Sequence, residues 1–139
     1  MTASSFEVIA VGKVESPLTD PETAPKQGDE GAPDAWLVFE TAFLPALEGI
    51  GVGDQAIVIT WLDRAGRDVL RVHPRGDPSR APRGVFATRS PHRPNPIGLH
   101  PVEILSMEGA RVRVSNLEAL DGTPVIDLKP MLDPAVGRR

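Results

Sequence analysis

The stretch GVFATRSPHRPNPIGL, residues 84–99, decides how this chain is interpreted. Its sixteen residues contain two arginines, three prolines, two glycines, one asparagine and one histidine. Each proline fixes its own φ and biases the residue before it toward extended geometry, and the residues so restrained are Ser90, Arg93 and Asn95. Polar side chains on so stiff a backbone lose little entropy when a ligand binds. The stretch therefore predicts a rigid loop that holds a small polar or anionic molecule.

The charge of the chain is unevenly distributed. Residues 64–93 contain eight arginines and two aspartates, a net charge of +6, whereas the whole chain carries −4. An arginine cluster within an acidic chain indicates a local anionic partner. The acidity of the remainder argues against a broad basic face that would follow a long stretch of RNA backbone.

Length and composition predict one globular domain over residues 1–139, with 40% hydrophobic and 24% charged residues. The chain has no cysteine, which excludes disulfides and cysteine metal sites, and no group of His, Asp and Glu has the spacing of metal ligands. The first residues, MTASSFEV, show no secretory signal, and no apolar run is long enough to cross a bilayer. We therefore expect a cytoplasmic protein with no metal and no membrane partner.

Short β runs separated by 15 prolines and 13 glycines predict a mainly β fold with few short helices. About one helical turn is expected at residues 43–50. Turns are expected at Glu108 and Gly109, within a hairpin, and at Asp121 and Gly122. About seven strands with little helix favour a small barrel or a sandwich. The expected strands lie at residues 8–14, 36–39, 55–62, 68–73, 84–88, 102–107, 109–117 and 125–128.

Four motifs carry a family resemblance. TRSPHRPNPIGL, residues 88–99, resembles the signature ATRSPxRPNPIGLS of the TrmO (YaeB/TsaA-like) family of S-adenosylmethionine-dependent tRNA methyltransferases. VIAVGKVESP at 8–17 resembles the family's IGxIxSP, PKQ at 25–27 its PRQ, and LDGTPVIDLK at 120–129 its LDGTPVLDIKPY. The resemblance runs from about residue 6 to residue 133.

The resemblance implies a small β-barrel that forms homodimers and binds S-adenosylmethionine without a Rossmann motif, which this sequence lacks. It implies an enzyme that transfers a methyl group to the N6 nitrogen of threonylcarbamoyl-adenosine beside the tRNA anticodon. Lys26 stands where the family has arginine, which keeps the charge and loses the bidentate guanidinium. The implied cofactor residues are Pro25, Lys26, Gln27, Asp63, Arg64, Arg89, Leu99, Leu120, Asp121, Gly122 and Thr123.

Arg93 and Arg71 are the predicted substrate-binding residues, and Asp63 and His92 are the candidate acid–base groups. The family places a histidine where this chain has Asp63, and an aspartate among arginines is a weaker base. Arg89 and Arg93 have a second interpretation, in which they bind the backbone carbonyls of their own loop.

Three alternative functions remain open from the sequence. The same fold and cofactor would serve a small-molecule methyl acceptor. A non-catalytic module would bind S-adenosylmethionine as a sensor. A purely structural barrel would use the proline-rich signature to stabilise a dimer. Salt-dependent binding of tRNA would favour the methyltransferase.

Overall fold

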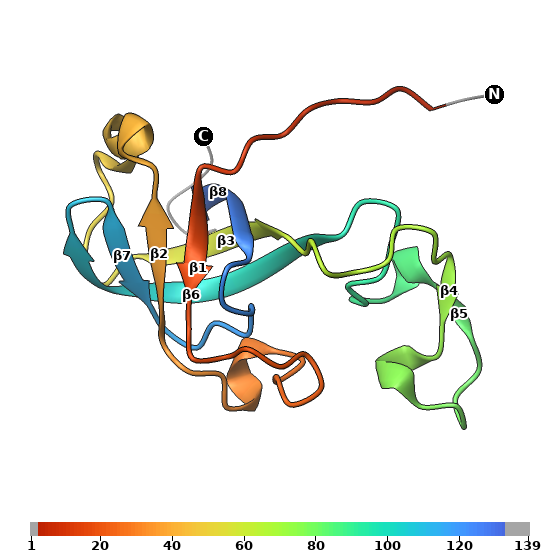
Figure 1. Cartoon of the computed structure of the whole chain (residues 1–139). Coiled ribbons are helices and arrows are strands. Elements are labelled where there is room, and N and C mark those ends of the chain that lie inside the picture. The colour runs from red at the N-terminus through yellow and green to blue at the C-terminus, as the bar shows by residue number, and fades with distance from the viewer. Residues whose placement is uncertain (1–2, 133–139) are drawn as a thin grey trace.

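Six antiparallel strands close on one another into a small barrel (Figure 1). The computed structural model describes residues 3–132. The strands follow one another around the barrel in the order β1, β2, β7, β6, β3, β8. The seam between β1 and β8 is short, with the pairs Gly12–Val125 and Lys13–Pro124. The mainly β barrel expected from the sequence is confirmed. The strands are β1 (Gly12–Glu15), β2 (Ala35–Phe39), β3 (Gln55–Trp61), β6 (Ile97–Glu108), β7 (Arg111–Val114) and β8 (Pro124–Pro130).

A two-stranded ribbon projects from one side of the barrel, where β4 (Arg71–Val72) pairs with β5 (Arg83–Gly84) (Figure 1). The helices in residues 3–132 are all short 3₁₀ segments, as expected, and none of them has the length and apolarity to cross a membrane. They are η1 (Gly28–Glu30), η2 (Thr41–Leu47), η3 (Pro74–Gly76) and η4 (Val85–Ala87).

The interior of the barrel is aliphatic at one end and polar at the other. Side chains alternate between the two faces of a strand, and in β6 the residues Gly98, His100, Val102 and Ile104 all point inward. Across the β3–β6 ladder, Ala56 pairs with Val102, Val58 with His100 and Thr60 with Gly98. Thr60, Gly98 and His100 form the polar end of this face. The chain between β3 and β6, residues 62–96, leaves the barrel at this end, and we call it the ribbon segment.

The predicted strand at residues 84–88 is wrong. The chain leaves β5 at Gly84 and turns into η4. The backbone N–H and the side-chain hydroxyl of Thr88 both donate to the carbonyl of Val85, at 3.0 Å each, which closes a turn that an extended strand cannot make. The predicted strand at 68–73 shortens to β4 because its partner β5 is equally short.

The first strand begins later than predicted, at Gly12 rather than residue 8. Its partner β2 ends at Phe39, opposite Gly12, so the residues before Gly12 have no residue of β2 to pair with. The apolar side chains of Phe6, Val8 and Ile9 are more than half exposed in an arm that extends away from the barrel (Figure 1).

Strand β6 begins earlier than predicted, at Ile97 rather than residue 102, and contains Pro101. Strand β7 contacts β6 only from Ile104 onward, so Pro101 pairs with a strand on one side, opposite Ile57. A proline lacks the N–H that a second neighbour would need, and an unpaired edge tolerates it. The predicted hairpin is confirmed as β6 and β7. Its turn lies at Gly109 and Ala110, one residue later than predicted, because Glu108 still pairs with Arg111.

Candidate functional site

A cleft of about 250 Å³ opens at the polar end of the barrel. Four segments far apart in the sequence line it: the loop that follows β1, the chain after β3, residues 89–100, and the chain before β8. The lining residues are Pro21, Ala24, Pro25, Lys26, Gln27, Leu62, Asp63, Arg64, Ala65, Arg89, Ser90, Pro91, His92, Arg93, Ile97, Gly98, Leu99, His100, Glu118, Ala119, Leu120 and Thr123.

Most of the residues predicted for the site lie around this cleft. The cleft therefore brings together the 25–27 loop, the chain after β3, the proline-rich signature and the Leu120 turn, although up to 98 positions separate them in the sequence. The predicted residues at the cleft are Pro25, Lys26, Gln27, Asp63, Arg64, Arg89, His92, Arg93, Leu99, Leu120 and Thr123.

Asp121 and Gly122 do not line the cleft and shape its wall instead. The carboxylate of Asp121 accepts the backbone N–H of Ser16 at 3.0 Å. Gly122 has a φ of 83°, which favours glycine, and its N–H donates to the carbonyl of Val14 at 2.7 Å. These bonds tie the turn to β1 and set the position of Thr123, which is buried at the cleft.

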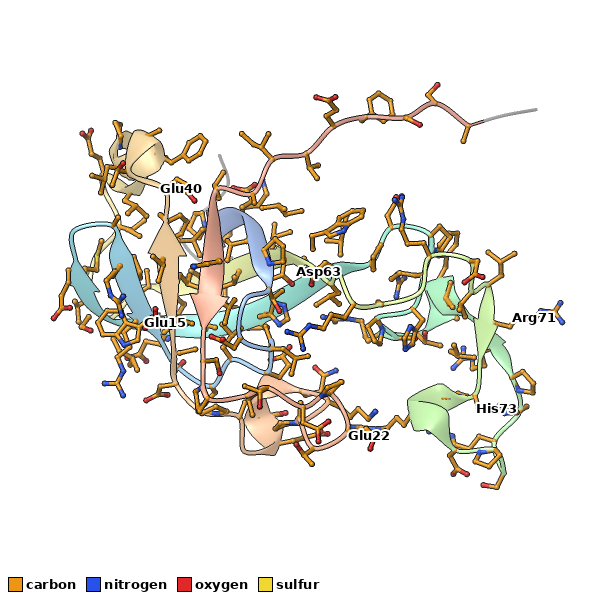
Figure 2. All side chains as sticks on the ribbon, in the orientation of Figure 1. Glu15, Glu22, Glu40, Asp63, Arg71 and His73 are labelled. Carbon is orange, nitrogen blue, oxygen red and sulfur yellow. The ribbon has the colours of Figure 1, made fainter. Side chains whose placement is uncertain are left out.

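Arg71 is the predicted substrate residue that the structure does not bring to the cleft. It lies on β4 in the ribbon, is exposed, and points away from the barrel (Figure 2). Asp63, in contrast, follows β3 at the junction of the barrel and the ribbon segment (Figure 2). The two residues are eight positions apart in the sequence, but the ribbon carries Arg71 away from Asp63 (Figure 2).

The arginine loop, residues 84–95, is held by guanidinium groups that donate to backbone carbonyls. Arg93 Nη1 donates to the carbonyl of Thr88 at 3.1 Å and to that of Ser90 at 3.0 Å. Arg89 Nη2 donates to the carbonyl of Leu99 at 3.3 Å. Arg93 thus binds its own loop and Arg89 binds β6, while both side chains line the cleft.

Arg67 is a loop-holding residue that sequence reasoning missed. Its Nε donates to the carbonyl of Pro94 at 2.8 Å and its Nη2 to the side chain of Asn95 at 3.1 Å. Its guanidinium lies over the ring of Trp61, 5.0 Å from the ring centre. The only signal in the sequence was that Arg67 belongs to the arginine cluster.

The two candidate acid–base groups differ in their surroundings. His92 is exposed, and its Nδ1 accepts the backbone N–H of Gly66 at 2.9 Å. A neutral ring that accepts at Nδ1 carries its proton on Nε2, and its remaining lone pair is engaged by the N–H of Gly66. The carboxylate of Asp63 is exposed at the cleft and is therefore the better placed of the two to accept a proton.

A polar chain that sequence reasoning missed lies at the floor of the cleft, where His100 and Glu118 line it and Thr60 is buried behind His100. We call Thr60, His100 and Glu118 the polar floor. Thr60 Oγ1 lies 2.7 Å from Nε2 of His100, and Nδ1 of His100 contacts a carboxylate oxygen of Glu118. A carboxylate can only accept, so Nδ1 carries the proton and, in the neutral ring, Nε2 accepts from the Thr60 hydroxyl. An inward-facing histidine on β6, diagonal to an inward-facing threonine on β3, was the signal that could have revealed it.

No group of three or more His, Asp or Glu residues in the described chain lies close enough together to hold a metal ion. Positive side chains from Lys26, Arg64, Arg89 and Arg93 surround the cleft, and the carboxylates are those of Asp63 and Glu118.

Curated relatives match most of this chain. A 119-residue stretch is 45% identical to the "S-adenosyl-L-methionine-binding protein" of Archaeoglobus fulgidus, and it covers 86% of this chain and 84% of that one. A second protein of Archaeoglobus fulgidus, a "Probable S-adenosyl-L-methionine-binding protein", is 48% identical over 120 residues. That match covers 86% of this chain but only 32% of the longer relative.

Solved structures share the fold. The crystal structure of TrmO from Pseudomonas aeruginosa superposes with a TM-score of 0.76 at 30% sequence identity. The match covers 95% of this chain and 58% of that protein, so this chain spans less than two thirds of its length. The family model of the tRNA-methyltransferase O N-terminal domain matches residues 13–135. This chain therefore belongs to the TrmO family, whose fold it shares.

Proposed function

We propose that the cleft binds S-adenosylmethionine and that the chain transfers the methyl group of this cofactor to RNA. The observation that carries the proposal is the mixed character of one cleft. Arg89 and Lys26 supply positive charge, Glu118 supplies negative charge, and Ile97 and Leu99 supply apolar surface. S-adenosylmethionine presents a carboxylate, two cationic centres and an adenine, and so needs all three kinds of lining. The names of the relatives support the same cofactor.

Within this proposal each wall of the cleft has a role. Arg89 and Lys26 hold the carboxylate, since both carry charge that the rigid loops keep at the cleft. Leu99 and Leu120 flank the adenine. When bound, the cofactor supplies a methyl group already activated on a sulfonium. The chain positions the donor and the acceptor and excludes water from them.

The proposed acceptor is the N6 nitrogen of threonylcarbamoyl-adenosine beside the tRNA anticodon. Membership of the family supports it, as does the excess of arginine around the cleft. Arg64, Arg93 and Arg71 would contact the RNA phosphates, with His92 near the base. Asp63 would accept the proton that leaves the acceptor nitrogen.

Calorimetric titration with S-adenosylmethionine tests the cofactor. We expect micromolar binding by the wild type and a loss of at least about tenfold in Arg89→Ala, since a charge-assisted hydrogen bond is removed. Arg80→Ala is the matched control, because Arg80 is exposed in the ribbon segment and outside the cleft. No heat from the folded wild type would reject the proposal.

Transfer of a labelled methyl group to tRNA tests the reaction. We expect label in tRNA that carries threonylcarbamoyl-adenosine and none in tRNA that lacks it. Binding of that tRNA is expected to weaken as salt rises. Tight cofactor binding with no label in any tRNA would contradict the tRNA part of the proposal alone.

A second function, a non-catalytic S-adenosylmethionine-binding module, is favoured by one observation. The match to the Archaeoglobus fulgidus "S-adenosyl-L-methionine-binding protein" covers 84% of that protein. Its name states binding of the cofactor and does not state methyl transfer. Under this proposal the cofactor would be recovered unchanged after incubation with RNA and with small-molecule acceptors alike.

We further propose that the chain forms a homodimer. Five of the large apolar side chains that are more than half exposed lie on the N-terminal arm and in the chain between β3 and β6, and exposed apolar surface is typical of interfaces. Light scattering after size-exclusion chromatography tests it: a monomer at micromolar concentration would reject it. The variants Phe6→Ser and Phe86→Ser show whether the dimer contact lies on the N-terminal arm or on the arginine loop, since only the variant in the contact would weaken the dimer. The five side chains are Phe6, Val8, Ile9, Leu70 and Phe86.

A further inference from the structure

The two carboxylate oxygens of Glu118 have different surroundings. One oxygen, Oε1, is bound to the ring of His100. The other, Oε2, makes no hydrogen bond with residues 3–132. Every fully buried side-chain oxygen and nitrogen in that range has a partner, so Oε2 is open to solvent. Glu118 is also one of the residues that line the cleft.

The position of Glu118 is fixed by its neighbours. Its side chain is 15% exposed and that of His100 is 5% exposed. His100 is itself held on its far side by the fully buried hydroxyl of Thr60. Gly98 leaves room for this pair, because a Cβ on Gly98 would lie 2.5 Å from Thr60 Oγ1 and 2.7 Å from His100 Nε2.

The free oxygen also lies close to the chain that follows the Pro25–Gln27 loop. A Cβ on Gly28 would lie 3.3 Å from Oε2 of Glu118. Gly28 follows directly on the Pro25–Gln27 loop, which lines the cleft. A ligand held between this loop and the floor of the cleft would therefore meet the Glu118 carboxylate.

Glu118 supplies the negative charge at the floor. The other carboxylate of the cleft, Asp63, is exposed at its edge, and the side chains of Lys26, Arg64, Arg89 and Arg93 carry positive charge. An ion pair in a partly buried site is stronger than one in water. A ligand with one anionic and one cationic end would therefore be oriented by the cleft.

We propose that Glu118 binds the cationic centre of the ligand through its free oxygen, and that His100 and Thr60 are positioning residues that hold this carboxylate. The inference rests on the proposed binding of S-adenosylmethionine and adds a binding residue to that site. The cationic centre is either the sulfonium or the ammonium of the ligand, and the two have different consequences.

A purely structural role for the polar floor is the competing interpretation. Buried polar chains are often neutral or costly for stability compared with well-packed apolar side chains. The rest of the inward face of β3 and β6 is aliphatic, including Val58, Val102 and Ile104. The polar residues interrupt this core only where it meets the cleft, which favours a role toward the ligand.

Glu118→Gln separates charge from structure. The glutamine carbonyl still accepts the N–H of His100, so the floor keeps its hydrogen bonds while the negative charge is lost. We expect the affinity for S-adenosylmethionine to fall by about 10- to 100-fold. Glu108→Gln is the matched control, since Glu108 is exposed at the far end of β6, outside the cleft.

Titration of the same variant with two further probes identifies the cationic centre. S-adenosylhomocysteine lacks the sulfonium and keeps the ammonium, whereas methylthioadenosine lacks both. A loss confined to S-adenosylmethionine assigns Glu118 to the sulfonium. A loss for S-adenosylmethionine and S-adenosylhomocysteine, with methylthioadenosine unaffected, assigns it to the ammonium.

Two outcomes overturn the inference. Equal losses for all three probes would mean that the substitution merely disturbs the cleft, and unchanged affinities would mean that Glu118 does not contact the ligand. If the wild type binds none of the probes, it is the proposed function that fails instead.

His100 is tested as a positioning residue by a rescue. His100→Leu removes the N–H that holds Glu118, whereas His100→Asn keeps an N–H donor near the same position. We expect weaker binding of S-adenosylmethionine in His100→Leu, substantial recovery in His100→Asn, and little change for methylthioadenosine in either. Equal loss in both variants for all probes would show a structural role alone.

Discussion

The polar floor and the arginine loop border the same cleft but hold their polar groups in opposite ways. In the floor, Thr60 and His100 are buried in the barrel and bind other side chains. In the loop, exposed or half-buried guanidinium groups bind backbone carbonyls, as Arg93 does. The floor therefore depends on the packing of the barrel, whereas the loop depends on hydrogen bonds that compete with water. Substitutions in the floor should alter global stability, and substitutions in the loop should alter local order.

The largest effect is expected at Gly98. In Gly98→Ala the new Cβ would lie 2.5 Å from Thr60 Oγ1 and 2.7 Å from His100 Nε2, and both neighbours are buried. We expect the free energy of unfolding to fall by about 2–3 kcal/mol. Gly51→Ala is the control, since a Cβ there meets nothing within 4 Å. Urea denaturation measures both, and equal stabilities would contradict the dependence of the floor on packing.

The next largest effect is expected at His100. His100→Leu leaves the buried Thr60 hydroxyl and one oxygen of Glu118 without a partner, and we expect a loss of about 2 kcal/mol. Adding Thr60→Val removes the orphaned hydroxyl and should restore about 1 kcal/mol. Denaturation of the two variants measures this, and a further loss in the double variant would show that the hydroxyl has another partner.

A smaller effect is expected in the arginine loop. Arg67→Ala removes the hydrogen bonds to Pro94 and Asn95 and the contact with Trp61, for a loss of about 1 kcal/mol. We expect the main effect to be a local loss of order in the loop, measured as faster cleavage by trypsin after Arg89. Arg80→Ala is the control. Unchanged cleavage would mean that the prolines alone order the loop.

The smallest effect is expected beyond the loop, at Asp77 in the ribbon segment. Hydrogen bonds from the side chain and the backbone of Ser79 lower the pKa of Asp77 below its ordinary value of 3.8. A lowered pKa stabilises the folded turn above pH 3.8, and this contribution is lost as the pH falls through the folded value. Titration by NMR should show the shift, and Ser79→Ala should raise the pKa toward 3.8. No change in Ser79→Ala would assign the shift to another group.

The barrel was predictable because its strands carry local signals. The apolar run at 55–62 corresponds to β3, and the alternation after Gly109 corresponds to β7. The start of β6 was not predictable in the same way, since prolines surround it and an edge position tolerates Pro101 only in the folded sheet. The helix at Val85–Ala87 depends on a turn closed by Thr88, which a β-rich composition does not reveal.

The site was predictable where it depends on a motif and not where it depends on packing. The signature and the Leu120 turn led to Arg89, Leu99 and Thr123, all at the cleft. The polar floor was missed because Thr60, His100 and Glu118 meet only through the closure of the barrel. The ribbon that separates Arg71 from the cleft is likewise a tertiary feature.

The distance in sequence between the floor residues links the ligand to the folding equilibrium. Thr60 and His100 are 40 positions apart, and His100 and Glu118 are 18 apart, so an unfolded chain contains no part of this site. A ligand that binds only the native state stabilises it by about 2.7 kcal/mol when present at 100 times its Kd. Half-life against proteolysis should then rise with ligand concentration, so that the amount of this protein in a cell follows the supply of the molecule that it binds.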